Sequence, residues 1–313
     1  MRSLLRAGVT WLLAAAPIIS NAASLEQVTS DFGPNPRNVR FYIYVPDKLA
    51  KTPPILVTPH WCSGDAQAVY TGSQYASLAD EYGFIVIYPE SPNDVDKCWD
   101  VSSNDTLTHD AGGDSLGIVS MVRYTLDKYD GDAGRVFVTG ISSGAMMTSV
   151  LLGAYPDVFA AGSAFAGVPY GCFGGDGYDL WNEACATGKI TKTGAEWADL
   201  VKAGYPGYTR WRPKVQILHG TADETIDYTN FEEEIKEWNA VFGFGEEPTS
   251  TTLDTPLTGW TKYVYGNDWL EAYSAFNVSH NIPNQEATVV EWFDLTCTGD
   301  DCFKWGKGGA DAQ

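Results

Sequence analysis

The chain has 313 residues, of which 44% are hydrophobic, and a formal net charge of −20 at pH 7. This length and apolar content are enough for a large hydrophobic core, which excludes a fibrous or disordered protein and favours a single α/β domain. The negative charge excludes nucleic acid as a partner, because its phosphates would be repelled.

The first 22 residues have the pattern of a secretory signal peptide. Arg2 and Arg6 precede or flank the start of an apolar run over residues 7–19, and cleavage is expected after Ala22 or Ala23. A membrane anchor is the alternative, but this run is shorter than the ~20 residues that span a bilayer. We therefore expect a secreted, extracellular protein with no membrane partner.

Beyond the signal peptide, strand-like runs alternate with helical patterns, and no repeat, linker or low-complexity block divides the sequence. This alternation predicts an α/β fold with a mostly parallel central sheet flanked by helices. We expect a catalytic domain over residues 23–296 and a short tail over residues 297–313. The expected strands are Val39–Val45, Ile55–Thr58, Phe84–Tyr88, Arg135–Thr139, Phe159–Phe165, Val215–Leu218 and Thr261–Tyr265. The expected helices are Ser73–Tyr82, Ser115–Tyr129, Ala145–Tyr155, Ala195–Ala203, Tyr228–Val241 and Gln285–Phe293.

The six cysteines are better explained by disulfides than by a metal site. An exported chain is oxidised, and no CxxC pair or histidine cluster accompanies them. Pairing cysteines that are close in sequence closes a short loop and staples the tail, and the remaining two pair by elimination. The expected disulfides are Cys172–Cys185, Cys297–Cys302 and Cys62–Cys98. Glycosylation sequons at Asn104 and Asn277 are also consistent with secretion.

Polar residues follow three of the expected strands. A parallel sheet binds its ligand at the carboxyl ends of its strands, so these segments are candidates for one site. They have the sequences PHWC (59–62), GISSG (140–144) and HGTAD (219–223).

The segment GISSG has the pattern of a nucleophile elbow. Glycines two residues before and two after Ser142 permit a very tight turn from strand to helix, which lifts the serine above the end of the sheet. Ser143 is also present, but only Ser142 is centred between the glycines. The alternative interpretation of this short motif is a structural turn that has no catalytic role.

A serine nucleophile needs an imidazole that accepts its proton. In α/β hydrolases the histidine follows the serine and the acid in the chain, which favours His280. It follows the last strand-like segment on an expected loop. His60 and His219 each follow a strand, where imidazoles commonly bind backbone groups, and His109 lies in a polar run that is typical of the surface.

Asp223 is the preferred acid, because it lies just beyond a strand. Glu224 and Asp227 are the rivals. Acyl transfer also needs donors for the oxyanion, and the backbone N–H after the nucleophile supplies one. That donor is Ser143, and we expect the second from the loop after an earlier strand, at Cys62 or alternatively at Trp61.

These motifs resemble the fungal carbohydrate esterase family 1 enzymes, which are acetylxylan esterases and feruloyl esterases of the PHB-depolymerase type. The segments that carry the resemblance include HWCSGD, CWDVSS, GISSG, YPGYTRWRP, HGTAD and SHNIP. The resemblance assigns the nucleophile to Ser142, the acid to Asp223 and the base to His280. It implies an α/β-hydrolase fold and deacylation of plant xylan without metal or cofactor. Some family members carry a cellulose-binding module, for which the tail is too short.

The room beside the nucleophile should decide between an acetyl and a feruloyl ester. Large indoles would leave room for acetyl only and would stack on xylose rings. The candidate substrate-binding residues are Trp61, Trp181 and Tyr170, and Trp99 is either a further liner or a core residue.

We therefore predict a monomeric acetylxylan esterase that acts on acetylated xylan or xylo-oligosaccharides, with a feruloyl esterase as the alternative. A non-catalytic carbohydrate-binding protein would lack one of the three triad residues, all of which are present. A polyester depolymerase shares the same motifs and remains a third hypothesis.

Overall fold

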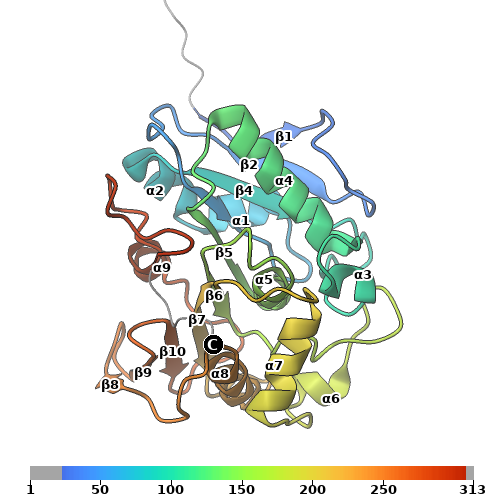
Figure 1. The fold of residues 1–313 in the computed structure, drawn as a ribbon, viewed down its shortest axis with the longest axis vertical. Helices are drawn as coiled ribbons and strands as arrows, with labels where there is room; N and C mark the ends of the chain where they lie inside the picture. The colour runs from blue at the N-terminus through green and yellow to red at the C-terminus, as the bar shows by residue number, and fades with distance from the viewer. Residues whose placement is uncertain (1–22, 308–313) are drawn as a thin grey trace, which may run out of the picture.

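The computed structural model describes residues 23–307, so the predicted signal peptide and residues 308–313 of the predicted tail lie outside it. Within the described chain, ten strands form one sheet in the order β1-β2-β4-β3-β5-β6-β7-β10-β9-β8 (Figure 1). The strands are β1 (Glu26–Val28), β2 (Arg40–Tyr44), β3 (Ile55–Val57), β4 (Ile85–Glu90), β5 (Val136–Ile141), β6 (Ala161–Phe165), β7 (Lys214–Gly220), β8 (Ser250–Leu253), β9 (Trp260–Tyr265) and β10 (Leu270–Ala275).

The centre of the sheet is parallel, as the sequence predicts. Each neighbouring pair from β4 through β3, β5, β6 and β7 to β10 runs in parallel. The outer pairs, β1 with β2, β2 with β4, β10 with β9, and β9 with β8, are antiparallel. The carboxyl ends of the parallel strands therefore meet along one edge, where a site can form.

The expectation that the strand over Thr261–Tyr265 is the last one is wrong. That strand is β9, and the chain returns as β10, which pairs with β7. Polar side chains interrupt the apolar pattern of β10. Glu271 is buried and accepts hydrogen bonds from Gln216 of β7 and from Tyr273. Short strands β1 and β8 were likewise not expected from the sequence.

Helices cover both faces of the sheet, and the sheet separates the core into two layers (Figure 1). Buried side chains of α4, α5, α7 and α8 pack on one face, and those of α1, α2 and α9 on the other. None of the described helices is long and apolar enough to cross a membrane. The helices are α1 (Ala66–Gly72), α2 (Tyr75–Tyr82), α3 (Asn104–Leu107), α4 (Gly113–Tyr129), α5 (Ser143–Ala154), α6 (Glu183–Ala186), α7 (Gly194–Ala203), α8 (Thr229–Phe242) and α9 (Glu286–Trp292).

The alternation of side chains along the central strands explains the two layers. In β5, Val136 and Val138 face the layer that contains α4 and α5, whereas Phe137 faces the layer that contains α9. Successive side chains of a strand point to opposite faces, and all three of these are fully buried. A strand buried on both faces reads as a continuous apolar run, which is why β5 was recognisable from the sequence.

All three predicted disulfides are present: Cys62–Cys98, Cys172–Cys185 and Cys297–Cys302. The Cys297–Cys302 disulfide forms a short loop at the start of the tail. Beyond it, the indole N–H of Trp305 donates to the carbonyl oxygen of Pro156 at 2.7 Å. The tail up to residue 307 therefore packs against the domain.

The buried carboxyl of Glu234 in α8 should make the stability of the folded protein depend on pH. It is fully buried beside Gly167, and burial raises the pKa of its carboxyl to about 8. In the unfolded chain this carboxyl ionises at lower pH than in the folded protein. The folded protein should therefore lose stability as the pH rises from about 4.5 to 8, and this group contributes roughly 1.4 kcal/mol per pH unit to the loss. We expect Glu234→Gln to flatten this fall, as measured by urea unfolding at pH 5 and pH 8.

Glu232 lies on the same helix but is exposed, so Glu232→Gln is the matched control and should leave the pH dependence unchanged. An equal fall of stability in Glu234→Gln and in the unsubstituted protein would contradict the assignment.

Candidate active site

Ser142 lies at the corner between β5 and α5. Its backbone has φ 58° and ψ −122°, a conformation that a non-glycine residue rarely adopts. A methyl group on Gly140 would lie 2.5 Å from the backbone of Gly144, and one on Gly144 would collide with the carbonyl oxygen of Pro59. The close approach of these backbones thus requires both glycines, and the serine is held on a strained turn as the motif predicts.

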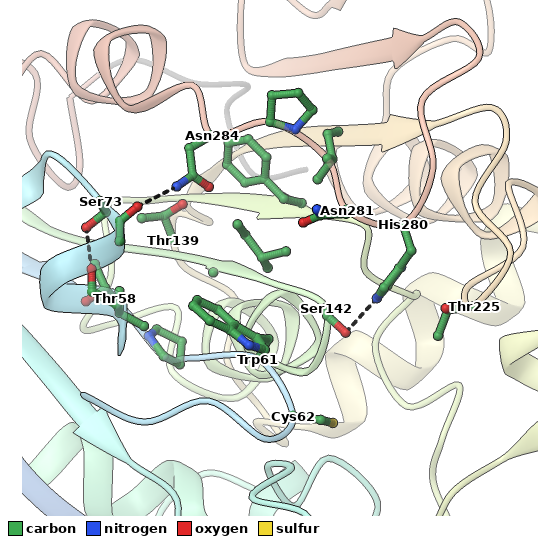
Figure 2. A pocket seen from close by; sticks show the side chains of 18 of the residues that line it. Thr58, Trp61, Cys62, Ser73, Thr139, Ser142, Thr225, His280, Asn281 and Asn284 are labelled. Atoms are coloured by element: carbon green, nitrogen blue, oxygen red, sulfur yellow. Dashed lines mark hydrogen bonds between the residues drawn. The ribbon is translucent and has the colours of Figure 1, made fainter. Parts of the chain in front are cut away.

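The structure brings Ser142, His280 and Asp223 together. Figure 2 shows the side chain of His280 pointing toward Ser142. The Oγ atom of Ser142 lies 2.9 Å from Nε2 of His280, and Nδ1 of His280 lies 2.8 Å from Oδ2 of Asp223. Asp223 belongs to the turn after β7, and His280 to the loop after β10. The alcohol, the imidazole and the carboxylate therefore form a continuous hydrogen-bonded chain, the arrangement that activates a serine nucleophile.

The carboxylate of Asp223 is stabilised in its ionised form. Its side chain is fully buried, which alone would raise its pKa. Hydrogen bonds outweigh that effect: two histidines face Oδ2, and Oδ1 accepts from the amides of Thr225 and Ile226. Together they hold the pKa of Asp223 well below its usual range, so the residue remains a carboxylate across the physiological pH range.

The other candidate bases make structural contacts instead. His60 is fully buried, where Nδ1 is 2.7 Å from the carbonyl oxygen of Trp61 and Nε2 accepts from the amide of Ser91. Burial lowers the pKa of His60. His109 is only partly exposed rather than on the open surface, and its ring stacks on Tyr205 at 3.7 Å.

The rival acids are separate from the hydrogen-bonded chain of Ser142, His280 and Asp223. Glu224 accepts a hydrogen bond from the backbone amide of His280 and lines the cleft, but the imidazole faces Asp223. Asp227 binds the amide and hydroxyl of Thr229 at the start of α8.

Of the two expected oxyanion donors, Ser143 adjoins the serine in the chain and Cys62 lines the same cleft. Ser143 is the first residue of α5, so its amide has no acceptor within the helix. In residues 23–307 the amide of Cys62 donates to no other protein group, and Cys62 lines the same cleft as Ser142. The Cys62–Cys98 disulfide holds this loop, and the amide of Trp99 donates to Oγ of Ser143 at 2.8 Å. The loop and the elbow are thereby joined.

A cleft of about 860 Å³ opens beside Ser142 (Figure 2). Trp61 and Trp181 line it and are 37% and 54% exposed, so both are placed to meet a ligand. An acetyl group has only three non-hydrogen atoms, so the cleft as a whole is much larger than the acyl group and has room for part of a sugar chain as well. The apolar residues that line it were missed by sequence reasoning, although two of them adjoin the histidine in the segment SHNIP. They are Val69, Tyr75, Ile141, Phe165, Ile282 and Pro283.

The expectation that Tyr170 binds substrate is wrong. Its side chain is only 3% exposed, does not line the cleft, and donates its hydroxyl proton to the carbonyl oxygen of Leu107. The ring occupies the space left by Gly153 of α5, where a methyl group would lie 2.5 Å from it. Trp99 is also a core residue, with its indole N–H bound to the carbonyl oxygen of His60.

Among residues 23–307, one group of potential metal ligands gathers within coordinating distance, Asp294 with Cys297 and Cys302. Its two sulfur atoms are joined in a disulfide, so they offer no thiolate. This group lies outside the cleft.

Comparison with known proteins identifies similar enzymes. Residues 39–235 match the family model described as Esterase PHB depolymerase. Acetylxylan esterase A from Emericella nidulans is 50% identical over 275 residues, which cover 87% of this chain and 90% of that protein. Feruloyl esterase B from Talaromyces funiculosus is 47% identical over 292 residues, which cover 92% of this chain and 80% of that protein. The solved acetyl xylan esterase from Aspergillus awamori has a TM-score of 0.85 at 45% identity and covers 87% of this chain and 99% of its own.

The sheet topology and these similarities define the class of the protein, a carboxylic ester hydrolase with an α/β-hydrolase-type fold. The family model spans more than half of the chain, and the relatives are similar over most of their length. The chain belongs to the Esterase PHB depolymerase family. The resemblance to fungal acetylxylan and feruloyl esterases is thereby confirmed.

The site predicts the effect of removing the serine hydroxyl. Ser142→Ala should lower kcat on p-nitrophenyl acetate by roughly 10⁴-fold, because no other group can form the acyl-enzyme. Ser143→Ala is the matched control. It keeps the backbone amide and loses only the hydrogen bond from Trp99, so its kcat should stay within about tenfold of the unsubstituted enzyme. Near-normal turnover by Ser142→Ala would reject the site.

Proposed function

We propose that this protein is a secreted serine esterase that removes acetyl groups from acetylated xylan. The observation that carries the proposal is the hydrogen-bonded chain from Ser142 through His280 to Asp223 at the edge of an open cleft. The name of one relative, acetylxylan esterase A, supports acetylated xylan as the substrate, and that of the other, feruloyl esterase B, supports an ester hydrolase.

The first chemical step forms an acetyl-enzyme. Oγ of Ser142 attacks the acetyl carbonyl carbon while Nε2 of His280 accepts the hydroxyl proton. Asp223 holds the imidazole with its proton on Nδ1 and stabilises the imidazolium that forms. The amides of Ser143 and Cys62 donate to the oxyanion of the tetrahedral intermediate. The imidazolium of His280 then gives its proton to the sugar oxygen as the bond between that oxygen and the acetyl carbon breaks, so the free hydroxyl of the xylan leaves and the acetyl-enzyme remains.

The second step releases acetate. Water attacks the acetyl carbonyl carbon while His280 accepts a proton from it, and the bond to Oγ of Ser142 breaks as His280 returns that proton to Oγ. The reaction needs no group other than these side chains, the amides and water.

The polysaccharide should bind across the indoles of Trp61 and Trp181. Both rings line the cleft and are partly exposed, and an aromatic face packs well on the apolar face of a sugar ring. Xylan carries few ionic groups that would be repelled by the acidic chain, whose net charge is −20. The enzyme is proposed to act as a monomer.

Secretion is part of the proposal. The predicted signal peptide and the three disulfides support an oxidising, extracellular location. Asn104 is exposed, which supports its use as a glycosylation site. Asn277 is also exposed, but it lies only three residues before His280, so we do not expect a glycan there.

The apolar residues that line the cleft favour a second candidate, an esterase for aromatic acyl groups such as feruloyl. Val69, Tyr75 and Phe165 are among them, and an apolar surface of this kind suits a planar ring better than an acetyl group. The similarity to feruloyl esterase B supports the same candidate.

Rates on two substrates separate the candidates. We expect kcat/KM on acetylated xylan to exceed that on methyl ferulate by roughly tenfold or more, because the indoles bind the polysaccharide. The Ser142→Ala variant measures the background release of acetate and ferulate. A large preference for methyl ferulate would replace the acetyl assignment by the aromatic one.

A further inference from the structure

His219 lies next to the triad acid but takes no part in the mechanism described above. It is the penultimate residue of β7, and its side chain is fully buried. Its Nε2 atom lies 2.9 Å from the carbonyl oxygen of Ile226 and 3.3 Å from Oδ2 of Asp223. Oδ2 is the same oxygen that binds Nδ1 of His280.

The contacts of His219 fix the position of its proton. Both groups that face Nε2 are hydrogen-bond acceptors, so Nε2 carries a hydrogen, which is donated to the carbonyl oxygen of Ile226 and lies beside Oδ2 of Asp223. In the described chain, Nδ1 is buried and has no hydrogen-bond partner. A proton on Nδ1 would be a buried donor without an acceptor, which favours the neutral Nε2–H tautomer.

The surroundings of His219 leave Asp223 as its charged neighbour. The rings of Tyr228 and Phe231 lie beside it, with centroids 6.0 and 6.4 Å away. Burial raises the pKa of Tyr228 to about 12, and its hydroxyl donates to Ser274 of β10, so it is a neutral phenol at the working pH. On β10, the residue directly opposite His219 is Ser274.

We infer that His219 is a positioning residue for catalysis, which fixes the orientation of the Asp223 carboxylate and shares its negative charge with His280. Two amides hold Oδ1, and two imidazoles face Oδ2, so the carboxylate cannot turn about its Cβ–Cγ bond without breaking contacts. The inference rests on the proposed function, because it concerns the acid of the same triad.

Loss of the Nε2–H donor has two consequences. Oδ2 is then held by His280 alone, so the carboxylate orients the imidazole less firmly, which lowers the rate of the chemical step and leaves binding unchanged. The negative charge of Asp223 is then no longer shared with His219 and acts on His280 alone. This favours the protonated form of His280, which cannot accept the proton of Ser142. The acid limb of the kcat/KM profile should therefore move to higher pH.

Three variants test the inference. His219→Phe keeps a planar ring without a donor, His219→Gln places an amide N–H near the position of Nε2, and Tyr228→Phe removes a neighbouring hydroxyl that does not touch Asp223. We expect His219→Phe to lower kcat by about 10- to 100-fold with little change in KM, and to shift the acid limb upward. His219→Gln should recover most of this loss, and Tyr228→Phe should keep the original pH profile.

A spectroscopic readout makes the test independent of turnover. The Nδ1–H proton of His280, bound to a carboxylate, should give a strongly downfield proton resonance in the free enzyme, and His219→Phe should shift or broaden it.

If Ser142→Ala retains activity, the proposed function fails whatever His219 does. If Ser142→Ala is inactive but His219→Phe keeps the original pH profile and resonance, the positioning role alone fails.

Two further outcomes would overturn the inference. Equal impairment of His219→Phe and His219→Gln, with parallel losses of thermal stability, would mean that the ring acts through packing only. Should His219→Phe not fold, His219→Asn replaces it. Its shorter amide cannot reach Asp223, so we expect the same loss of kcat, and an unaltered profile would contradict the role.

Discussion

The hydrogen bond between Nδ1 of His280 and Oδ2 of Asp223, at 2.8 Å, is the interaction on which the proposed chemistry depends. It joins the segments after β7 and β10, which pair in parallel and therefore end at the same edge of the sheet. A buried carboxylate is costly unless donors surround it, and here the Thr225 and Ile226 amides supply them together with the imidazoles. Asp223 thus belongs both to the packed core and to the proposed site.

A second constraint holds Ser142, the proposed nucleophile. Gly140 and Gly144 let the backbones of the elbow and of the loop after β3 approach more closely than any side chain would permit. The same approach brings the loop that carries Cys62 against the start of α5, where Ser143 and Trp99 join the two segments. The strained conformation of Ser142 is therefore maintained by packing on both sides, and the expected oxyanion donors are positioned by the same contacts.

The nucleophile motif could be read from the sequence because its determinants are local: an apolar strand, two glycines and a helix. The position of His280 followed from chain order alone, although the strand that precedes it, β10, was missed because polar residues such as Glu271 interrupt its pattern. Tyr170 was misassigned because the direction of its ring depends on the missing side chain of Gly153, which is distant in sequence. The apolar lining of the cleft likewise comes from segments that only the fold brings together.

Covalent labelling by an organophosphonate tests the central claim, that His280 and Asp223 activate Ser142, most directly. Peptide mass spectrometry after reaction at neutral pH should find one adduct per chain, on Ser142, and the reaction should be lost in His280→Ala. An adduct on Ser143 instead, or a protein that cleaves esters without being labelled at all, would contradict the account.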